Sequence, residues 1–266
     1  MTAMATAPDW RTRHALVTGG ARGIGLAVTQ ALLERGARVT VLGRSPLAAD
    51  RLRTLAGSTD AAARLQAVAA DVAEPAAVAQ ALAQARAGFG AIDTLVNNAG
   101  QAHSAPFIKM DAALWQQMLA VNLTGTMVCT QAALPDMLAA GWGRIVNVAS
   151  TAAQRGYAYV SAYCAAKHGV LGLTRSLALE LATKGVTVNA VCPGYTETDL
   201  LQDSIANIVA KTGRSEDEAR AQLAAGNPQK RLVQPHEVAD AVLWLCQTGS
   251  ASVTGQAISV SGGEVM

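Results

Sequence analysis

The sequence has little charge. Only 15% of its 266 residues are Asp, Glu, Lys or Arg, the net charge is +2, and both signs are interspersed along the chain. A nucleic-acid-binding protein needs a concentrated basic surface, and a protein of the membrane surface needs a basic amphipathic face, so neither class is indicated. No run of 18 apolar residues occurs, which excludes a predicted membrane-spanning helix.

Cysteine is also scarce, and its spacing argues against two kinds of site. The four cysteines, at 129, 164, 192 and 246, form no C-x-x-C pair and have no histidines at ligand spacing. We therefore expect buried thiols in a reducing compartment, no disulfide and no metal site. The four histidines have no partner pattern either, and we interpret them as structural or solvent-facing.

The first residues lack an apolar segment of the kind that directs secretion. The stretch MTAMATAPDWRTRH has no apolar run long enough for a signal peptide. We expect a cytoplasmic protein with a short flexible N-terminal tail at 1–13 and a single domain at 14–266.

What the sequence has is a regular alternation of short β-branched runs with longer Ala/Leu-rich segments. The runs predict strands at 14–18, 38–42, 65–71, 93–97, 144–148, 186–191 and 257–261, with helices near 24–35, 46–56, 75–87, 111–139, 157–182 and 235–247. Connections this long require parallel pairing, and strands without polar alternation are covered on both faces. The predicted fold is α/β: a doubly wound, Rossmann-type, seven-stranded parallel sheet with helices on both faces.

One segment interrupts the alternation. Residues 198–232 lie between the sixth predicted strand and the last helix, and Ser215 with Glu218 three residues later predicts a capped helix through about Ala225. An extra helical pair on one side of an open sheet is a candidate lid. A surface excursion without function is the alternative.

A glycine-rich turn, TGGARGIG, directly follows the first predicted strand. Gly19, Gly23 and Gly25 let the backbone turn sharply and approach a pyrophosphate, which the free N–H groups of the following helix bind. The spacing departs from the commonest dinucleotide fingerprint, but the strand before it and the helix after it supply the required context. The turn therefore predicts a dinucleotide site.

The end of the second predicted strand favours a phosphorylated dinucleotide. A free ribose 2′-hydroxyl is usually held there by Asp or Glu, but this chain has Gly43 and Arg44 and no acid until Asp50. Arg22, inside the glycine-rich turn, can point toward the same place. Two guanidiniums favour a 2′-phosphate, so we predict NADP(H), with NAD as the alternative if both are ordinary surface arginines.

Three of the four tyrosines lie in STAAQRGYAYVSAYCAAK, residues 150–167. A tyrosine has a reference pKa of about 10, so it needs a nearby cation to act in acid–base chemistry at neutral pH. A lysine four residues later on a helix supplies one. Only Tyr163 has this partner, Lys167, and we predict that it is the reactive tyrosine.

Other motifs accompany this pair. Ser150 ends the fifth predicted strand, NNAG ends the fourth, Asn122 sits in an apolar helix, and PGYTETD follows the sixth. With the glycine-rich turn and the Asp71-Val72 pair, these motifs resemble, in order and spacing, those of a single-domain short-chain dehydrogenase/reductase. The resemblance runs from about His14 to Gly263.

The resemblance implies a role for each matched residue. Tyr163 would exchange a proton with substrate, Ser150 would polarise the carbonyl, Lys167 would lower the pKa of Tyr163 and hold the nicotinamide ribose, and Asn122 would place a water. Asp71 and Val72 would contact adenine, and Thr196 the nicotinamide carboxamide. The implied cofactor site comprises Gly19, Arg22, Gly23, Ile24, Gly25, Arg44, Asp71, Val72, Asn98, Ala99, Gly100, Tyr163, Lys167, Pro193, Gly194 and Thr196. The substrate pocket is expected to include Ala152, Gln154, Tyr157, Tyr159 and Tyr195, with simple packing as the alternative for the tyrosines.

The implied reaction interconverts a ketone and a secondary alcohol. The length of 198–232 and the ending ISVSGGEVM resemble 3-oxoacyl-thioester reductases, 3-hydroxyacyl-CoA dehydrogenases and polyketide ketoreductases. We expect a 3-oxoacyl-CoA or carrier-protein thioester. Lid cations (Lys211, Arg214, Lys230, Arg231) are candidates to meet the carrier's phosphates, with solvated surface charge as the alternative for each of them. A broad reductase of cyclic or aryl ketones is the alternative. A catalytically silent NADP(H)-binding regulator is disfavoured because the serine, tyrosine and lysine are all present.

The resemblance also implies a homotetramer. The helices around 111–139 and 157–182 would pack across a two-fold axis. Their Ala-rich faces suit close helix packing, but burial within one subunit would give the same pattern.

Overall fold

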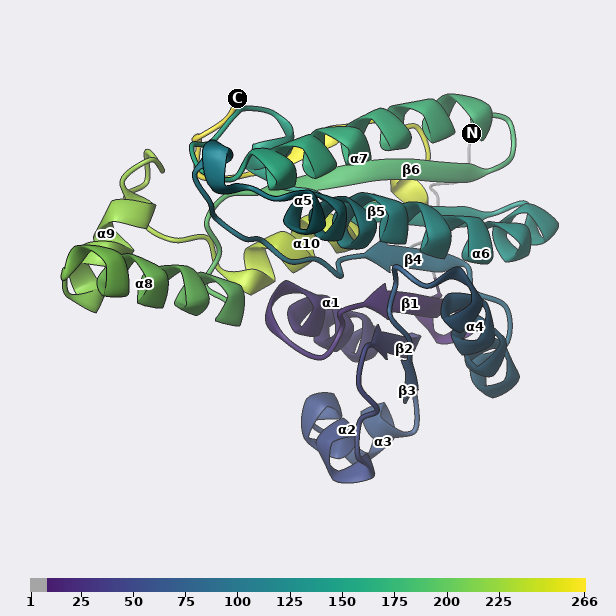
Figure 1. Cartoon of the computed structure of the whole chain (residues 1–266). Coiled ribbons are helices and arrows are strands. Elements are labelled where there is room, and N and C mark those ends of the chain that lie inside the picture. The colour runs from purple at the N-terminus through teal and green to yellow at the C-terminus, as the bar shows by residue number, and fades with distance from the viewer. Residues whose placement is uncertain (1–8) are drawn as a thin grey trace.

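Four neighbouring strands of the protein are buried on both faces, as the sequence predicts. The computed structural model describes residues 9–266. Every residue is buried in β1 (His14–Thr18), β4 (Thr94–Asn97), β5 (Gly143–Val148) and β6 (Val186–Pro193). With β2 (Arg38–Gly43), β3 (Leu65–Ala69) and β7 (Ala257–Val260) they form one parallel seven-stranded sheet (Figure 1). The predicted fold class is confirmed.

The strand order is β3-β2-β1-β4-β5-β6-β7, so the winding reverses at β1. Leu16 of β1 is aligned with Thr40 of β2 on one side and with Leu95 of β4 on the other. The segments that leave β1 and β4 therefore diverge to opposite faces and open a crevice at the carboxyl edge. Open α/β sheets bind ligands at such a point.

Helices cover both faces of the sheet (Figure 1). One buried apolar cluster joins β1 and β2 to α1 (Gly23–Glu34), α2 (Ala49–Ala56) and α10 (Pro235–Leu245). A second joins the sheet to α4 (Pro75–Phe89), α6 (Gly125–Ala140) and the end of α7 (Ser161–Glu180). The short α3 (Thr59–Ala62) and the 3₁₀ turns η2 (Phe107–Lys109), η4 (Thr151–Ala153) and η5 (Thr248–Ser250) complete the connections.

Two predicted helices differ from those observed. The segment predicted as one helix at 111–139 is α5 (Ala112–Leu119), a π-helical turn η3 (Ala120–Thr124) and α6. The helix predicted from residue 157 begins at Ser161, because the preceding backbone is not helical: Tyr159 has a φ of 68°. Both differences lie beside predicted site residues.

The inserted segment forms two helices, α8 (Asp199–Thr212) and α9 (Glu216–Ala224), at one end of the molecule (Figure 1). The predicted capping box is confirmed: Ser215 accepts a hydrogen bond from the Glu218 N–H, and the Glu218 carboxylate accepts one from the Ser215 N–H. The two helices share a small apolar cluster of Leu201, Ile205, Ala219, Ala224 and Leu232. They pack as a unit with its own core.

The predicted N-terminal tail is only partly covered by the structure. Residues 1–8 lie outside the described residues. The prediction of a flexible segment is wrong for the last residues of the tail, because Trp10–Thr12 form a 3₁₀ turn, η1, and the Trp10 side chain is buried in the core. Arg13 then pairs with Asp93 and stacks on Trp142, with its guanidinium carbon 3.6 Å from the ring centroid.

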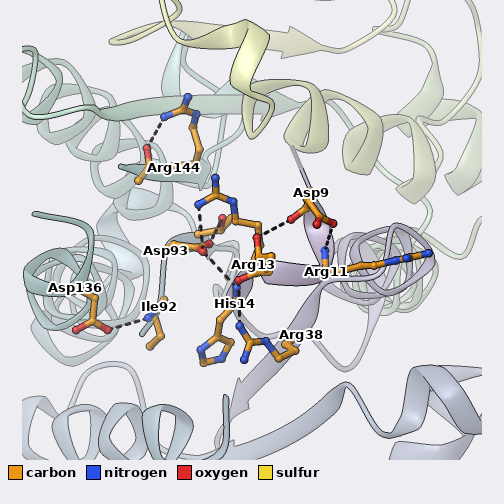
Figure 2. A network of polar contacts seen from close by, with 12 residues as sticks. Asp9, Arg11, Arg13, His14, Arg38, Ile92, Asp93, Asp136 and Arg144 are labelled. Atoms are coloured by element: carbon orange, nitrogen blue, oxygen red, sulfur yellow. Dashed lines mark hydrogen bonds and ion pairs between the residues drawn. The ribbon is translucent and has the colours of Figure 1, made fainter. Parts of the chain in front are cut away.

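A polar network occupies this amino-terminal edge of the sheet (Figure 2). His14 is fully buried; its Nδ1 lies 2.8 Å from the Gly90 carbonyl oxygen and its Nε2 lies 2.7 Å from Oγ1 of Thr40. Asp93 lies between Arg13 and the His14 backbone N–H. The network ties η1 to three strands and leaves the opposite edge for the site.

All four cysteines are buried free thiols, as predicted. Within residues 9–266, no cluster of His, Cys, Asp and Glu has the arrangement of a metal site. In the same range, no helix combines the length and apolar character that a membrane span requires.

Candidate active site

The glycine-rich turn is shaped by close backbone contacts. Gly19 and Gly23 adopt φ values of 65° and 53°, which favour glycine. A Cβ on Gly25 would lie 2.2 Å from the Gly19 carbonyl oxygen, so no larger residue fits. Asn98 holds the turn from the neighbouring strand end: its Nδ2 donates to the carbonyl oxygens of Thr18 at 3.0 Å and Gly19 at 3.2 Å. Asn98 is thus a support of the turn.

The start of α1 fits a pyrophosphate. Arg22 is the N-cap residue, and its side chain makes no capping hydrogen bond to the first turn. The N–H groups of that turn have no partner within the helix and point out of its positive end, the arrangement that binds phosphate. The next residue, Ile24, packs partly against the core and anchors the helix start.

The end of β2 offers cations and space. Arg22 and Arg44 are both exposed, and none of the side chains that the structure describes forms a hydrogen bond or ion pair with either guanidinium. A Cβ at Gly43 would meet nothing within 4 Å. Asp50, the first acid after β2, is exposed and paired with Arg53 of its own helix. The first acid after β2 is therefore already paired, whereas the exposed Arg44 directly follows the strand.

The residues predicted to contact adenine have clear structural partners. Asp71 accepts a hydrogen bond from the Ala73 N–H at 3.0 Å, which closes the turn after β3. Val72 is buried against Gly125 of α6, where a Cβ would approach the valine within 2.7 Å. The turn is thereby held at the carboxyl edge, beside the ends of β1 and β2.

The NNAG motif links the glycine-rich turn to Asn122 and Lys167. The Ala99 N–H donates to Oγ1 of Thr18 at 2.9 Å. A Cβ on Gly100 would lie 2.8 Å from Oδ1 of Asn122 and 3.7 Å from Nζ of Lys167. Glycine at this position is what allows those two side chains to converge on the end of β4.

Asn122 is fully buried in the π-helical turn η3, and its hydrogen bonds fix the orientation of its amide. Its Oδ1 accepts from the Gln101 N–H at 3.2 Å, and its Nδ2 donates to the carbonyl oxygens of Gln101 at 2.9 Å and Met118 at 3.0 Å. Single π turns within α-helices are frequent at functional sites.

Lys167 and Tyr163 lie together at the start of α7. Nζ of Lys167 donates to the Val148 carbonyl oxygen at 2.9 Å and lies 5.7 Å from the Tyr163 ring centroid. Burial lowers the pKa of Lys167 to about 8, so the lysine keeps its proton at neutral pH. The predicted i, i+4 pairing of these two side chains is observed.

Burial raises the pKa of Tyr163 to about 12, and a hydrogen bond with Ser150 opposes this rise. The lowering of this pKa expected from Lys167 is therefore not found in the protein chain, because desolvation of the phenolate is the larger effect. Ser150 lies in extended backbone just beyond β5, and its Oγ also accepts a hydrogen bond from the Ala152 N–H at 3.1 Å. The structure brings Ser150, Tyr163 and Lys167 together.

The chain after β6 turns across the carboxyl edge. Pro193 ends the strand, and the Gly194 N–H donates to the Val260 carbonyl oxygen of β7 at 3.0 Å. Thr196 is buried; its hydroxyl donates to the Gly194 carbonyl oxygen at 3.0 Å, and its backbone is bridged to Val233. These bonds fix Thr196 three residues before the start of α8.

The predicted pocket residues separate into two groups. Tyr157 and Tyr195 lie together, with ring centroids 6.3 Å apart in an edge-to-face arrangement. Tyr159 is apart from them: it is 65% exposed, and its carbonyl oxygen accepts from Ala105. Gln154 accepts a hydrogen bond from Ser259 of β7, and Ala152 is buried. Only Tyr157 and Tyr195 are brought together as the prediction requires.

One carboxylate at this place was missed from the sequence. Oε1 of Glu264 accepts a hydrogen bond of 2.6 Å from the Tyr157 hydroxyl, which also lies 2.8 Å from Oγ1 of Thr151. The available signal was an acid after two glycines in SGGEVM. No local pattern connects that acid to a tyrosine more than a hundred residues earlier.

Comparison with known proteins agrees with this geometry. A family profile described as short chain dehydrogenase matches residues 13–208, and the chain belongs to the short-chain dehydrogenase/reductase family. It is an oxidoreductase that acts on a CH–OH or keto group, and its family binds NAD(P).

Individual relatives cover nearly the whole chain. A cis-4-hydroxycyclohexanecarboxylate dehydrogenase of Sinomonas cyclohexanicum is 41% identical over 94% of this chain and 96% of its own. A D-beta-hydroxybutyrate dehydrogenase of Rhizobium meliloti (strain 1021) is 36% identical over 95% and 98%. A crystal structure of actinorhodin polyketide ketoreductase, as a variant with NADPH, superposes with a TM-score of 0.89 at 38% identity, covering 98% and 99%.

Proposed function

We propose that the protein is an NADPH-dependent reductase of 3-oxoacyl thioesters. The main support for this reaction is that Ser150, Tyr163 and Lys167 lie together at the carboxyl edge of the sheet. The hydroxyls of Ser150 and Tyr163 bind the substrate carbonyl oxygen, and the phenol of Tyr163 transfers its proton to that oxygen as it gains negative charge. The nicotinamide cofactor, when bound, supplies the hydride.

Lys167 and Asn122 support that proton transfer. The lysine, charged below its pKa of about 8, stabilises the phenolate that Tyr163 becomes, and its ammonium also reaches the ribose side of the site. The Asn122 amide holds the backbone at Gln101. In this proposal, Asn122 also places the water through which the site exchanges protons with solvent. Because Tyr163 is protonated at neutral pH, its resting state is the one that reduction requires.

The preference for NADPH rests on Arg22 and Arg44. Both guanidiniums are exposed and free of partners among the described residues, beside the open end of β2 at Gly43. A 2′-phosphate offers them charge-assisted, bidentate contacts, whereas a free 2′-hydroxyl would find no acid there. The NADPH bound to the related actinorhodin ketoreductase supports the same choice.

The proposal of a thioester substrate is supported by the two helices at 198–232, which we propose to form a lid. A hollow of about 430 Å³ at its base is lined by the cations Arg220, Lys230 and Arg231 and by the carboxylates Glu197 and Asp217, and Arg220 is paired with Glu197. Arg231 is held by both oxygens of Glu237, but Lys230 donates only to a backbone carbonyl and is free to meet a phosphate. The similarity to a polyketide ketoreductase favours a substrate on a pantetheine carrier.

A second candidate is a reductase or dehydrogenase of cyclic ketones and alcohols. It is favoured by the 41% identity to a hydroxycyclohexanecarboxylate dehydrogenase.

The test is oxidation of NADPH and of NADH with acetoacetyl-CoA, with Tyr163→Phe as the control. Turnover that prefers NADPH and is lost in Tyr163→Phe is the expected result. Intact cofactor binding without turnover of acetoacetyl-CoA, but with turnover of cyclic ketones, would replace the thioester by the second candidate.

We also propose that the protein is a homotetramer. Large apolar side chains are exposed on α6 and α7, namely Met127, Leu138 and Leu179, and the last is 82% exposed. Such side chains on adjacent helices suit a symmetric contact with a second copy. Light scattering after gel filtration measures the assembly, and a monomer would contradict the proposal.

A further inference from the structure

We propose that Glu264 determines which substrates enter the site, by excluding those with a carboxylate near the reacting carbonyl and admitting neutral esters, thioesters and ketones. The inference rests on the proposed function, since it assigns a selectivity to the same site. It concerns the substrate side of the reaction rather than the proton transfer.

A fixed turn positions Glu264 after β7. Gly262 and Gly263 adopt φ values of 61° and 92°, and a Cβ on Gly262 would lie 2.1 Å from Oδ1 of Asn227. The Glu264 N–H donates to the Ser261 carbonyl oxygen at 3.2 Å, and the Val265 N–H donates to Oγ of the same serine at 3.3 Å. The turn directs the chain back toward the ends of β6 and the lid.

The carboxylate occupies a place that glycines leave open. Its Oε2 lies 3.1 Å from where a Cβ would stand on Gly194, after β6, and its Oε1 lies 3.3 Å from where one would stand on Gly226, after α9. Oε1 also accepts the 2.6 Å hydrogen bond from Tyr157. The carboxylate therefore lies between the strand end that leads to Thr196 and the base of the lid.

A continuous wall of side chains joins Glu264 to the reacting groups. Tyr157 reaches Thr151, the neighbour of Ser150, and packs edge-to-face on Tyr195. The carboxylate disfavours ionisation of both tyrosines, and Tyr195 in turn lies near enough to disfavour ionisation of Tyr163. In this proposal, a substrate whose carbonyl oxygen meets Ser150 and Tyr163 extends along these side chains toward Glu264.

The two charged side chains at Tyr157, Arg155 and Glu264, differ in their exposure to solvent. Arg155 lies over the Tyr157 ring, with its guanidinium carbon 4.8 Å from the centroid, but it is exposed and screened by solvent. Glu264 is half-buried and held by a short hydrogen bond. A second carboxylate brought beside it would lose its hydration and meet a like charge, and both effects oppose binding.

The proposed selectivity would differ from the one that the names of two relatives suggest. Their names denote carboxylate substrates, a hydroxybutyrate and a hydroxycyclohexanecarboxylate. A 3-oxoacyl thioester has no carboxylate beside the ketone, because the carrier occupies that carbon. Glu264 is thus compatible with the proposed substrate and opposed to the free acid.

The test compares methyl acetoacetate with acetoacetate, which have the same carbon skeleton and differ in charge. We expect the native protein to reduce the ester with a kcat/KM about tenfold or more above that for the acid. Glu264→Gln keeps the size of the side chain and removes its charge, and should bring the ratio close to one by raising kcat/KM for acetoacetate. Tyr157→Phe keeps the charge and should retain the preference.

Arg155→Gln is the control, because it removes one charge of the opposite sign beside the same tyrosine. It should not raise turnover of acetoacetate. Equal turnover of acid and ester by the native protein, or an unchanged ratio in Glu264→Gln, would overturn the inference. If no β-keto compound is reduced, the proposed function fails, and the same ratio measured with 4-oxocyclohexanecarboxylate and its methyl ester then decides the role of Glu264.

Discussion

Nζ of Lys167 donates a hydrogen bond to the carbonyl oxygen of Val148, the last residue of β5, at 2.9 Å. The bond anchors the ammonium to the strand that leads to Ser150, so the lysine bridges the serine and tyrosine parts of the site. The same burial that secures this contact makes the lysine easier to deprotonate.

The first prediction concerns the pH dependence of reduction. Reduction requires charged Lys167, whose pKa is about 8, so kcat/KM for a ketone should fall as the pH rises through that value. In Lys167→Arg the cation persists to much higher pH, and the fall should disappear even if the rate is lower. Steady-state kinetics from neutral to alkaline pH measure both profiles. The same fall in the arginine variant would assign it to another group.

The second prediction concerns Tyr163 in the reverse direction. Alcohol oxidation requires the phenolate, and burial raises the pKa of this tyrosine to about 12. The oxidation rate at saturating alcohol should therefore increase with pH until deprotonation of Lys167 opposes it. Tyr163→Phe should lower the rate in both directions by about a hundred- to ten-thousandfold. Cofactor binding followed by fluorescence should be retained, and a variant with near-native turnover would refute the assignment.

The third prediction concerns the cofactor phosphate. Arg22→Gln and Arg44→Gln should each raise KM for NADPH by about tenfold while changing KM for NADH much less, because each removes one charge-assisted contact to the 2′-phosphate. Arg51→Gln, an exposed arginine on α2, is the matched control and should change neither constant. If all three variants change KM for NADPH equally, Arg22 and Arg44 have no specific role in binding the 2′-phosphate.

The fourth prediction concerns the tie between the cofactor loop and the lid. Glu197 follows Thr196 and holds both lid helices, through a 2.9 Å hydrogen bond from Gln202 of α8 and an ion pair with Arg220 of α9. Arg220→Gln should raise substrate KM by up to about fivefold with a smaller change in kcat. Because added salt screens the ion pair, it should raise the KM of the native protein toward that of the variant. Arg214→Gln, also in the lid but bonded only to Gln222, is the control. An effect confined to kcat would contradict a role in holding the lid.

The fifth prediction concerns stability. Burial lowers the pKa of His14 below its ordinary value of 6.5, so the folded protein binds this proton less readily than the unfolded chain. The contribution of neutral His14 to stability is complete above pH 6.5 and is lost as the pH falls below it toward the folded pKa. Urea unfolding should show this loss in the native protein and in His103→Gln, an exposed histidine. In His14→Gln the slope across this pH range should flatten.

The sequence predicted correctly those features that depend on a local pattern of residues. The seven strands follow from buried β-branched runs, and the capping box at Ser215 from two residues three apart. The pairing of Tyr163 with Lys167 follows from helical spacing. Each of these depends on contacts within one element or between consecutive ones.

What the sequence did not reveal depends on contacts between distant segments. Glu264 meets Tyr157 only because the turn after β7 returns to the end of β5. The burial of Trp10 requires a core assembled from much later residues. The pKa of Tyr163 is raised above all by desolvation, which helical spacing does not report.

The two hydrogen bonds from Asn98 to Thr18 and Gly19 give the glycine-rich turn its shape from within the protein. The turn is therefore held in one conformation before any ligand binds, and little conformational entropy remains to be lost on binding. Contacts between the turn and a pyrophosphate would then contribute to affinity without first offsetting the cost of ordering the loop. Cofactor binding would need no rearrangement of this loop.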